Sequence, residues 1–373
     1  MLKIAIVIGT RPQFIELAPI IHELEKIKSV RLLVYNTEQH YDMNMSSIFF
    51  EQLRIPGPDA VLDVHEGTHA EQTAKIIVRT ERLLTADKPN LVVVEGDTNS
   101  TLGAALAAAK LKIPIVHIEA GCRAFDKNLP EEINRVIVSH ITDLHFAPTK
   151  NCQSNLKLEG VDVNKIKMNG HPIVDAINIV KKQLRPVEEL EEIRNVDIVK
   201  RKYYFVTMHR DFNVDNPARL EAILKEIDKI ASTKKPVVFA VHPRTRKRIE
   251  QFGLSRYLQN IVALGPVGYV SSLSLIENAY AIISDSGGLT KESALLTTPS
   301  ITLRPNTEWI ETLDGCCNQL AFSKGNSITK CIERLDKNYD KIMQNTILLN
   351  KVFGRVGLSA AIAKTISSWD FEG

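Results

Sequence analysis

The sequence predicts an α/β fold with two doubly wound, Rossmann-like domains built on parallel sheets. Three observations indicate this fold. Short apolar runs alternate with longer helical patterns, which is the pattern of βα units. The alternation starts again after Gly170, and the 373 residues suffice for two domains that each bury a core.

In the first half, the strand candidates are apolar almost without interruption, as expected for strands covered on both faces of a parallel sheet. We expect strands at residues 4–8, 32–35, 91–95, 115–118 and 144–146. We expect helices at residues 12–28, 68–84 and 99–111. Pro12 suits the first turn of a helix, where an N–H group is not needed.

The second half repeats this arrangement. We expect strands at residues 203–207, 237–241, 261–264, 281–284 and 300–303, and helices at residues 217–231, 244–253, 271–280 and 288–296. The charged segment 181–202 reads as a helical connector with a solvated face. We therefore predict domains at residues 1–170 and 171–355, and a C-terminal segment, 356–373, whose helix at 358–369 packs back on the first domain.

Composition excludes several classes of protein. Lys and Arg number 47 against 44 Asp and Glu, so the net charge of +3 is no footprint of nucleic acid or of an acidic membrane. Five cysteines without a CxxC pair favour a reduced, cytoplasmic protein. The apolar N-terminus reads as a strand and not as a signal peptide, and no apolar run reaches the ~20 residues of a membrane span.

Chemistry-bearing residues follow the strands of the first domain. Gly9 and Arg11 start a helix, where free N–H groups and a guanidinium make either an anion site or an ordinary turn. Asp97 follows the strand at 91–95 and is a candidate catalytic carboxylate or a helix N-cap. Glu119 and Glu131 lie at the ends of neighbouring elements of the predicted sheet, so that their carboxylates can converge for acid and base chemistry. The alternative for Glu131 is an ordinary acidic residue in the first turn of a helix, where it offsets the helix dipole.

The second domain carries basic and glycine-rich loops at equivalent positions. His209 with Arg210 follows one strand, and His242 follows the next, which places imidazole and guanidinium groups for phosphate binding. Ser286, Gly287 and Gly288 begin a helix whose N–H groups can cradle phosphate. Glu292 lies one turn later and could accept ribose hydroxyls. Because ligands bind at the carboxyl ends of such sheets, we expect a central cleft faced by both domains.

Several common motifs are absent. The sequence has no GxGxxG after the first strand, no Walker A motif, no GxSxG and no HExxH, and its ten His do not cluster with Cys at metal-ligand spacings. This disfavours a dehydrogenase, a P-loop enzyme, an α/β-hydrolase and a zinc enzyme. We expect no metal and no cofactor.

Short motifs occur in order from residue 9 to about residue 311. They are Gly9-Thr10-Arg11-Pro12, Gln39-His40-Tyr41, Gly67-Thr68-His69-Ala70-Glu71-Gln72-Thr73, Gly96-Asp97-Thr98, Glu119-Ala120-Gly121, Pro130-Glu131-Glu132-Ile133-Asn134-Arg135, Val214-Asp215-Asn216 and Asp285-Ser286-Gly287-Gly288-Leu289. Each motif is short, but the ordered set is specific. It resembles the non-hydrolysing UDP-N-acetylglucosamine 2-epimerases.

The resemblance implies a GT-B architecture, a homodimer and a UDP-sugar substrate. It implies that a base removes the C2 proton of the sugar, that UDP leaves by anti elimination, and that UDP adds back with protonation on the other face. The implied catalytic residues are Asp97, Glu119, Glu131 and His209. The implied phosphate contacts are Arg11, Arg135, Ser286, Gly287 and Gly288, and the implied ribose contact is Glu292. No hydride moves, so no nicotinamide is needed.

The sequence departs from the usual pattern of that family at several positions, and we single out four: Glu16 for Lys, Phe212 for an acid, Lys291 for Glu and Trp309 for Arg. We hypothesise that Glu16 and Lys291 reverse a charged pair, and that Phe212 and Trp309 replace one by an aromatic pair that changes the preferred sugar. The alternatives to the epimerase are a hydrolysing relative that releases free sugar and UDP, a GT-B glycosyltransferase, and a sugar-nucleotide-binding protein without catalysis.

Overall fold

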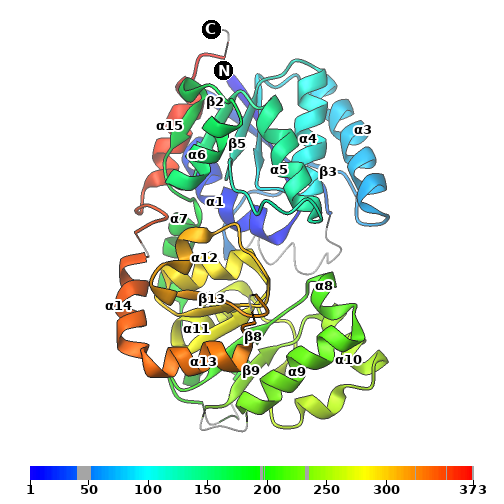
Figure 1. The fold of residues 1–373 in the computed structure, drawn as a ribbon. Coiled ribbons are helices and arrows are strands. Elements are labelled where there is room, and N and C mark those ends of the chain that lie inside the picture. Colours follow the sequence, from blue (N-terminus) through cyan, green and yellow to red (C-terminus); the bar gives the residue numbers. More distant parts are fainter. Residues whose placement is uncertain are drawn as a thin grey trace. The chain divides into compact units, whose positions relative to one another are not determined.

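The computed structural model describes residues 1–39, 52–193, 196, 198–231, 235–323, 325–349 and 351–371. The chain divides into two compact units, unit 1 (Met1–Val180 with Phe353–Gly373) and unit 2 (Lys181–Val352), shown in Figure 1. Unit 1 is therefore made of two separate stretches of chain. In the described part of the chain, no helix is both long and apolar enough to cross a membrane.

Unit 1 is built on a parallel seven-stranded sheet with the order β3-β2-β1-β4-β5-β6-β7. The strands are β1 (Leu2–Ile8), β2 (Val30–Asn36), β3 (Ala60–Val61), β4 (Leu91–Glu95), β5 (Ile115–Ile118), β6 (Leu144–Ala147) and β7 (Ile166–Met168). The order reverses at β1 and β4, which is the topological switch point of a doubly wound sheet.

The helices of unit 1 pack around its sheet and against one another. They are α1 (Arg11–Glu25), α3 (His69–Asp87), α4 (Asn99–Lys110), α5 (Pro130–Ile141), α6 (Lys150–Leu158), α7 (Ile173–Val180) and α15 (Leu358–Ser368). Ala5 and Val7 of β1 share a core cluster with residues of α3 and α4, while α1 packs against α7 and α15. Helix α15 thus joins the C-terminal stretch of the chain to the first helix.

Unit 2 is built on a parallel six-stranded sheet with the order β10-β9-β8-β11-β12-β13. Its strands are β8 (Tyr204–Thr207), β9 (Val237–Ala240), β10 (Val262–Leu264), β11 (Ala281–Ser284), β12 (Ser300–Thr302) and β13 (Asn318–Leu320). Its helices are α8 (Asp211–Val214), α9 (Pro217–Ala231), α10 (Pro243–Gln251), α11 (Tyr269–Asn278), α12 (Gly287–Leu295), α13 (Ile328–Lys337) and α14 (Tyr339–Leu349). Short 3₁₀ turns connect them at η5 (Ser255–Leu258) and η6 (Ile310–Cys316).

The predicted fold class, α/β with two parallel sheets, is confirmed. The helical connector expected at 181–202 is not found among its described residues, which form three short 3₁₀ turns: η2 (Lys181–Gln183), η3 (Val187–Glu189) and η4 (Glu191–Ile193). Val187 and Leu190 are buried, and η3 contacts α11. These apolar side chains pack against the rest of unit 2, and this packing favours short turns over the regular helix that the charge pattern suggests.

Candidate active site

The turn after β1 is held closed by Gln13 of α1. The Gly9 N–H donates to Gln13 Oε1 (2.9 Å), and Gln13 Nε2 donates to the Glu95 carbonyl at the end of β4 (2.9 Å). A Cβ atom on Gly9 would lie only 1.9 Å from Thr37 Oγ1, so no larger residue fits there. Arg11 is the first residue of α1, one residue before the predicted start, and Pro12 lies in the first turn as predicted.

Asp97 is not the N-cap of α4. Thr98 takes that position and accepts the Thr101 N–H with its side chain. The Asp97 carboxylate instead accepts from Arg135 Nη2 of α5, and Arg135 Nη1 donates to Glu132 (2.9 Å). The structure therefore brings two of the predicted site residues, Asp97 and Arg135, into one ion pair.

Glu119 lies directly after β5 in a left-handed backbone conformation, with φ of 64°. That conformation is uncommon for a residue other than glycine and is frequent at functional sites. His117 lies in β5, two residues before Glu119. Burial lowers the pKa of His117 to about 4, despite the hydrogen bond that its Nε2 donates to the Gly96 carbonyl (2.8 Å). His117 is thus neutral at pH 7 and holds the loop that leads to Asp97.

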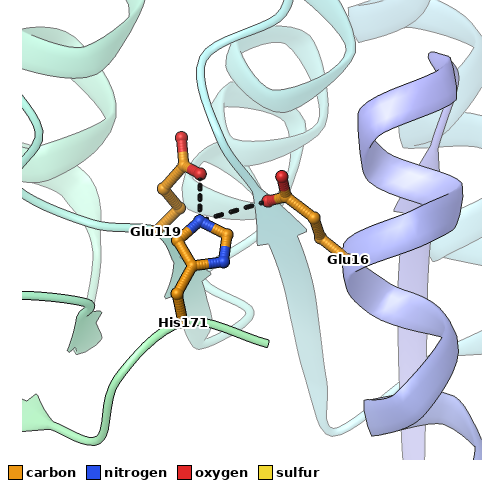
Figure 2. A group of neighbouring side chains, drawn as sticks. All are labelled: Glu16, Glu119 and His171. Atoms are coloured by element: carbon orange, nitrogen blue, oxygen red, sulfur yellow. Dashed lines mark hydrogen bonds and ion pairs between the residues drawn. The ribbon is translucent and has the colours of Figure 1, made fainter. Parts of the chain in front are cut away.

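A second side chain meets Glu119 from a distant part of the sequence. His171 Nε2 lies 2.5 Å from Glu119 Oε2 and 3.6 Å from Glu16 Oε2 of α1 (Figure 2). His171 and Glu16 are buried, with exposed fractions of 0% and 2%. The Ile173 backbone N–H donates to His171 Nδ1 (3.2 Å), and the backbone N–H of His171 donates to the Phe353 carbonyl (2.7 Å). We call Glu16, His171 and Glu119 the carboxylate–histidine cluster.

Two groups of side chains have metal-ligand geometry among the described residues. One is the carboxylate–histidine cluster; the other is Glu38, Asp63 and His65, which is more exposed. A histidine that binds a metal through Nε2 carries its proton on Nδ1 and donates it to a neighbouring acceptor. His171 Nδ1 instead faces the N–H donor of Ile173, so this histidine is set to carry its proton on Nε2.

Glu131 is the second residue of α5, directly after Pro130. The next acid, Glu132, is committed to structure, because it accepts the N–H groups of Ala124 and Phe125 (2.9 Å each) as well as Arg135. Glu131 precedes Glu132 in this turn and is the residue that the sequence predicts as a catalytic carboxylate.

In unit 2, Asp285 organises the turn after β8. Its buried carboxylate accepts the N–H groups of His209 (3.1 Å) and Arg210 (3.0 Å) and the Asn213 amide (3.0 Å). His209 Nδ1 also lies 3.4 Å from Asp285 Oδ1, and its ring is 5.4 Å from that of His242. The two predicted histidines therefore lie side by side.

The start of α10, directly after His242, is held by Asp215, the residue that follows α8. Asp215 pairs with Arg244 and with Arg248 Nε (2.8 Å), and the hydrogen bond from Arg244 is the main reason that the pKa of Asp215 is lowered. His242 is exposed and caps α10, with its Nδ1 accepting the Arg244 N–H (3.2 Å).

Ser286 is the N-cap of α12, so Gly287 and Gly288 begin that helix as predicted. A Cβ atom on Gly287 would lie 2.3 Å from Glu308 Oε1. Glu292 is buried one turn into the helix. The free N–H groups at this end and the partial positive charge of the helix suit a phosphate.

Two of the four departures meet each other in unit 2. Lys291 Nζ lies 4.6 Å from the centre of the Trp309 ring, which is a cation–π contact. Trp309 is buried, whereas Phe212 is 38% exposed. Glu16 belongs to unit 1, where His171 is its neighbour. The motif Gln39-His40-Tyr41 extends outside the described residues after Gln39, which accepts the Ser100 N–H (2.9 Å).

Sequence reasoning missed His171 and Asp285 as members of the site. His171 follows β7, a strand of three residues that leaves no recognisable apolar run, so no strand pattern marks the loop after it. Asp285 directly precedes the Ser-Gly-Gly sequence and stands at the end of β11, which is a signal that could have found it.

Comparisons with known proteins agree on one family. A family model described as UDP-N-acetylglucosamine 2-epimerase matches residues 22–367. The chain is 43% identical over 339 residues to the UDP-N-acetylglucosamine 2-epimerase of Methanocaldococcus jannaschii, covering 89% of this chain and 92% of that protein. It is 39% identical over 313 residues to the UDP-2,3-diacetamido-2,3-dideoxy-D-glucuronate 2-epimerase of Pseudomonas aeruginosa, covering 83% and 85%.

Solved structures give the same result. A crystal structure of the M. jannaschii UDP-GlcNAc 2-epimerase in complex with UDP-GlcNAc and UDP superimposes with a TM-score of 0.85 at 40% identity, covering 99% of this chain and 100% of that one. The Neisseria meningitidis enzyme bound to UDP-GlcNAc gives a TM-score of 0.87 at 28% identity, covering 99% and 100%. The expected GT-B type, with two Rossmann-like domains, is confirmed by these similarities.

Proposed function

The chain belongs to the UDP-N-acetylglucosamine 2-epimerase family, and from this we propose that it inverts C2 of a UDP-linked 2-acetamido sugar. The substrate pair is UDP-N-acetylglucosamine and UDP-N-acetylmannosamine, or a closely related pair. The M. jannaschii relative with that name and the structures that hold UDP-GlcNAc support this choice.

The reaction runs by elimination and re-addition. A base takes the C2 proton, the C1–O bond breaks, and its electron pair leaves with UDP, so that 2-acetamidoglucal and UDP remain bound. A UDP phosphate oxygen then re-forms the bond to C1 while C2 receives a proton on the opposite face. The C2 proton is weakly acidic, so each face needs a positioned acid or base.

The carboxylates of unit 1 supply these groups. Asp97, Glu119 and Glu131 act at C2, and Arg11 and Arg135 bind the leaving diphosphate. The observation that carries the proposal is that Asp97 and Glu119 follow adjacent strands, β4 and β5, of one parallel sheet, whose carboxyl edge is where ligands bind.

The groups of unit 2 bind UDP. Ser286, Gly287 and Gly288 hold a phosphate at the start of α12, and His209, Arg210 and His242 meet its charge. Glu292 binds the ribose. These groups stabilise the negative charge that develops on UDP as it leaves.

The test is NMR spectroscopy of UDP-N-acetylglucosamine incubated with the protein in D2O. Deuterium at C2, together with the C2 epimer, is the expected result. Release of free sugar and UDP would assign the hydrolysing reaction instead. Tight binding without exchange or release would show a binding protein without catalysis.

A related sugar is the second candidate substrate. The 39% identical P. aeruginosa protein is named for a diacetamido glucuronate, and this chain departs from the family pattern at Phe212 and Trp309. A panel of UDP sugars separates the candidates: a higher kcat/KM for a diacetamido or otherwise acylated sugar would support the altered preference.

We also propose that the protein acts as a cytoplasmic homodimer. The supporting observations are the family, whose members act on nucleotide sugars, and the absence of a membrane-spanning helix from the described residues. Light scattering coupled to size-exclusion chromatography tests the dimer, since this 41.7 kDa chain would elute with twice its mass.

A further inference from the structure

We propose that His171 is a positioning residue for Glu119: its Nε2–H donates to the Glu119 carboxylate, and Glu16 is a second carboxylate beside the same N–H (Figure 2). The inference rests on the proposed function, in which Glu119 is a catalytic carboxylate. It adds His171, which the motifs of the sequence did not place in the site, and it gives Glu16 a role beside it.

The tautomer of His171 follows from its two ring nitrogens. Nδ1 accepts the Ile173 N–H (3.2 Å), so it carries a lone pair and no proton. The remaining proton lies on Nε2, which is 2.5 Å from Glu119 Oε2. The neutral imidazole is therefore a donor to Glu119 and not a base toward it.

The ring cannot turn away from Glu119 at low cost. His171 is fully buried, its backbone N–H donates to the Phe353 carbonyl, and its ring meets the Phe353 ring edge to face at 6.1 Å. Gly170 makes this fit possible: its φ is +85°, and a Cβ there would lie 2.6 Å from the Phe353 carbonyl oxygen. The donor is thus set in place before any substrate binds.

Glu16 gives the cluster its second effect. Its carboxylate brings a like charge close to Glu119, which favours the protonated form of Glu119, whereas the donor from His171 favours the ionised form. The charge of Glu119 also acts on His117 and on Cys122, both from its own segment. His171 and Glu16 therefore shift the proton affinity of Glu119 in opposite directions.

Two substitutions of His171 separate positioning from packing. The amide nitrogen of a glutamine reaches the place of Nε2, while that of an asparagine reaches only the place of Nδ1. We expect His171→Asn to lower kcat about 10- to 100-fold, as the loss of a hydrogen bond to a charged group predicts, with KM changed less than about twofold. His171→Gln should restore most of the loss. Equal kcat in both variants, or a loss in KM alone, would overturn the proposal.

The pH dependence of kcat distinguishes a positioning role from a packing defect, because a packing defect alone does not shift the pH limb that reports Glu119. In His171→Asn, the limb that reports Glu119 should move to higher pH, because the donor to the ionised form is lost. In Glu16→Gln it should move to lower pH, because a like charge is removed. Shifts in the same direction, or none, would contradict the cluster as described.

The hydrogen bond itself is measured without turnover. In ¹H–¹⁵N NMR of the whole chain, His171 should appear as the neutral Nε2–H form, identified by its loss in His171→Gln, and Glu119→Gln should shift it. A Nδ1–H form, or activity that EDTA removes and Mn²⁺ restores, would overturn the assignment. Absence of C2 exchange in the unaltered protein would instead refute the proposed function. The ¹H–¹⁵N NMR measurement would still test the hydrogen bond between His171 and Glu119.

Discussion

The guanidinium of Arg135 donates to the carboxylate of Asp97, so two residues expected to have separate roles share one ion pair. Glu132 is the second partner of the same guanidinium, at 2.9 Å. Arg135 and Glu132 are almost fully buried. Arg135 therefore fixes the direction of Asp97 as well as being a candidate contact for UDP.

Removal of Arg135 should destabilise the protein. In Arg135→Ala, the carboxylates of Asp97 and Glu132 lose the cation that compensates them, and we expect unfolding to cost about 3 kcal/mol less. Arg135→Lys keeps the charge and should lose less. Urea unfolding followed by circular dichroism checks both. Equal stability of all three proteins would contradict the described ion pair.

Substitution of the candidate catalytic carboxylates should affect turnover much more than UDP binding. Asp97→Asn, Glu119→Gln and Glu131→Gln should each lower kcat by about 10²- to 10⁴-fold, the usual value of a positioned acid or base. UDP affinity, measured by calorimetry, should change little. Turnover that survives all three substitutions would show that these residues have been assigned wrongly.

Asp285 should matter although it is not itself expected to meet the sugar. Asp285→Asn puts an amide group where the carboxylate accepted N–H groups from His209, Arg210 and Asn213. We expect weaker UDP binding and a loss of about 2 kcal/mol in stability, because buried donors are left unpaired. The matched control is Asp340→Asn at the exposed start of α14, which should change stability by less than about 1 kcal/mol.

Stability should fall as the pH drops from 6.5 to 4. Burial lowers the pKa of His117 to about 4, so in this window the unfolded chain binds a proton that the folded chain does not. The loss is about 3 kcal/mol for this residue alone. Thermal melts from pH 7 to pH 4 should show a smaller decline for His117→Gln. Part of the decline should remain, because burial lowers the pKa of His145 to about 3.

Gly9 should tolerate no side chain. In Gly9→Ala the new methyl group meets Thr37 Oγ1 and Ser100 Oγ, which are hydrogen-bonded to each other at 2.7 Å. We expect a loss of about 1–3 kcal/mol, the usual cost of overpacking. Gly57→Ala is the control, since a Cβ there has no neighbour within 4 Å among the described residues. Similar melting temperatures for both variants would count against the close approach.

The central strands could be predicted from the sequence because burial on both faces leaves a continuous apolar run. Strands β4, β5 and β11 were predicted with the bounds they have. Strands β3, β7 and β13 were missed. They are two or three residues long, and β7 contains Lys167, so their pairing is decided by the neighbouring strand and not by their own composition.

The candidate site could be predicted only in part, for a related reason. The rule that functional residues follow strands placed Asp97 and Glu119, but it could not distinguish Asp97 from Thr98 as the N-cap. It also could not supply partners that are distant in sequence. His171 lies 52 residues from Glu119, and the contact depends on packing that no local pattern records.

The divided construction of unit 1 reverses the usual order of folding on the ribosome, in which the N-terminal domain finishes first. Residues 181–352 form unit 2 as one continuous stretch, so that unit has its whole sequence before Phe353 is synthesised. Unit 1 still lacks α15 and the Phe353 carbonyl that holds His171. The carboxylate–histidine cluster is therefore assembled only after the whole of unit 2 has been synthesised.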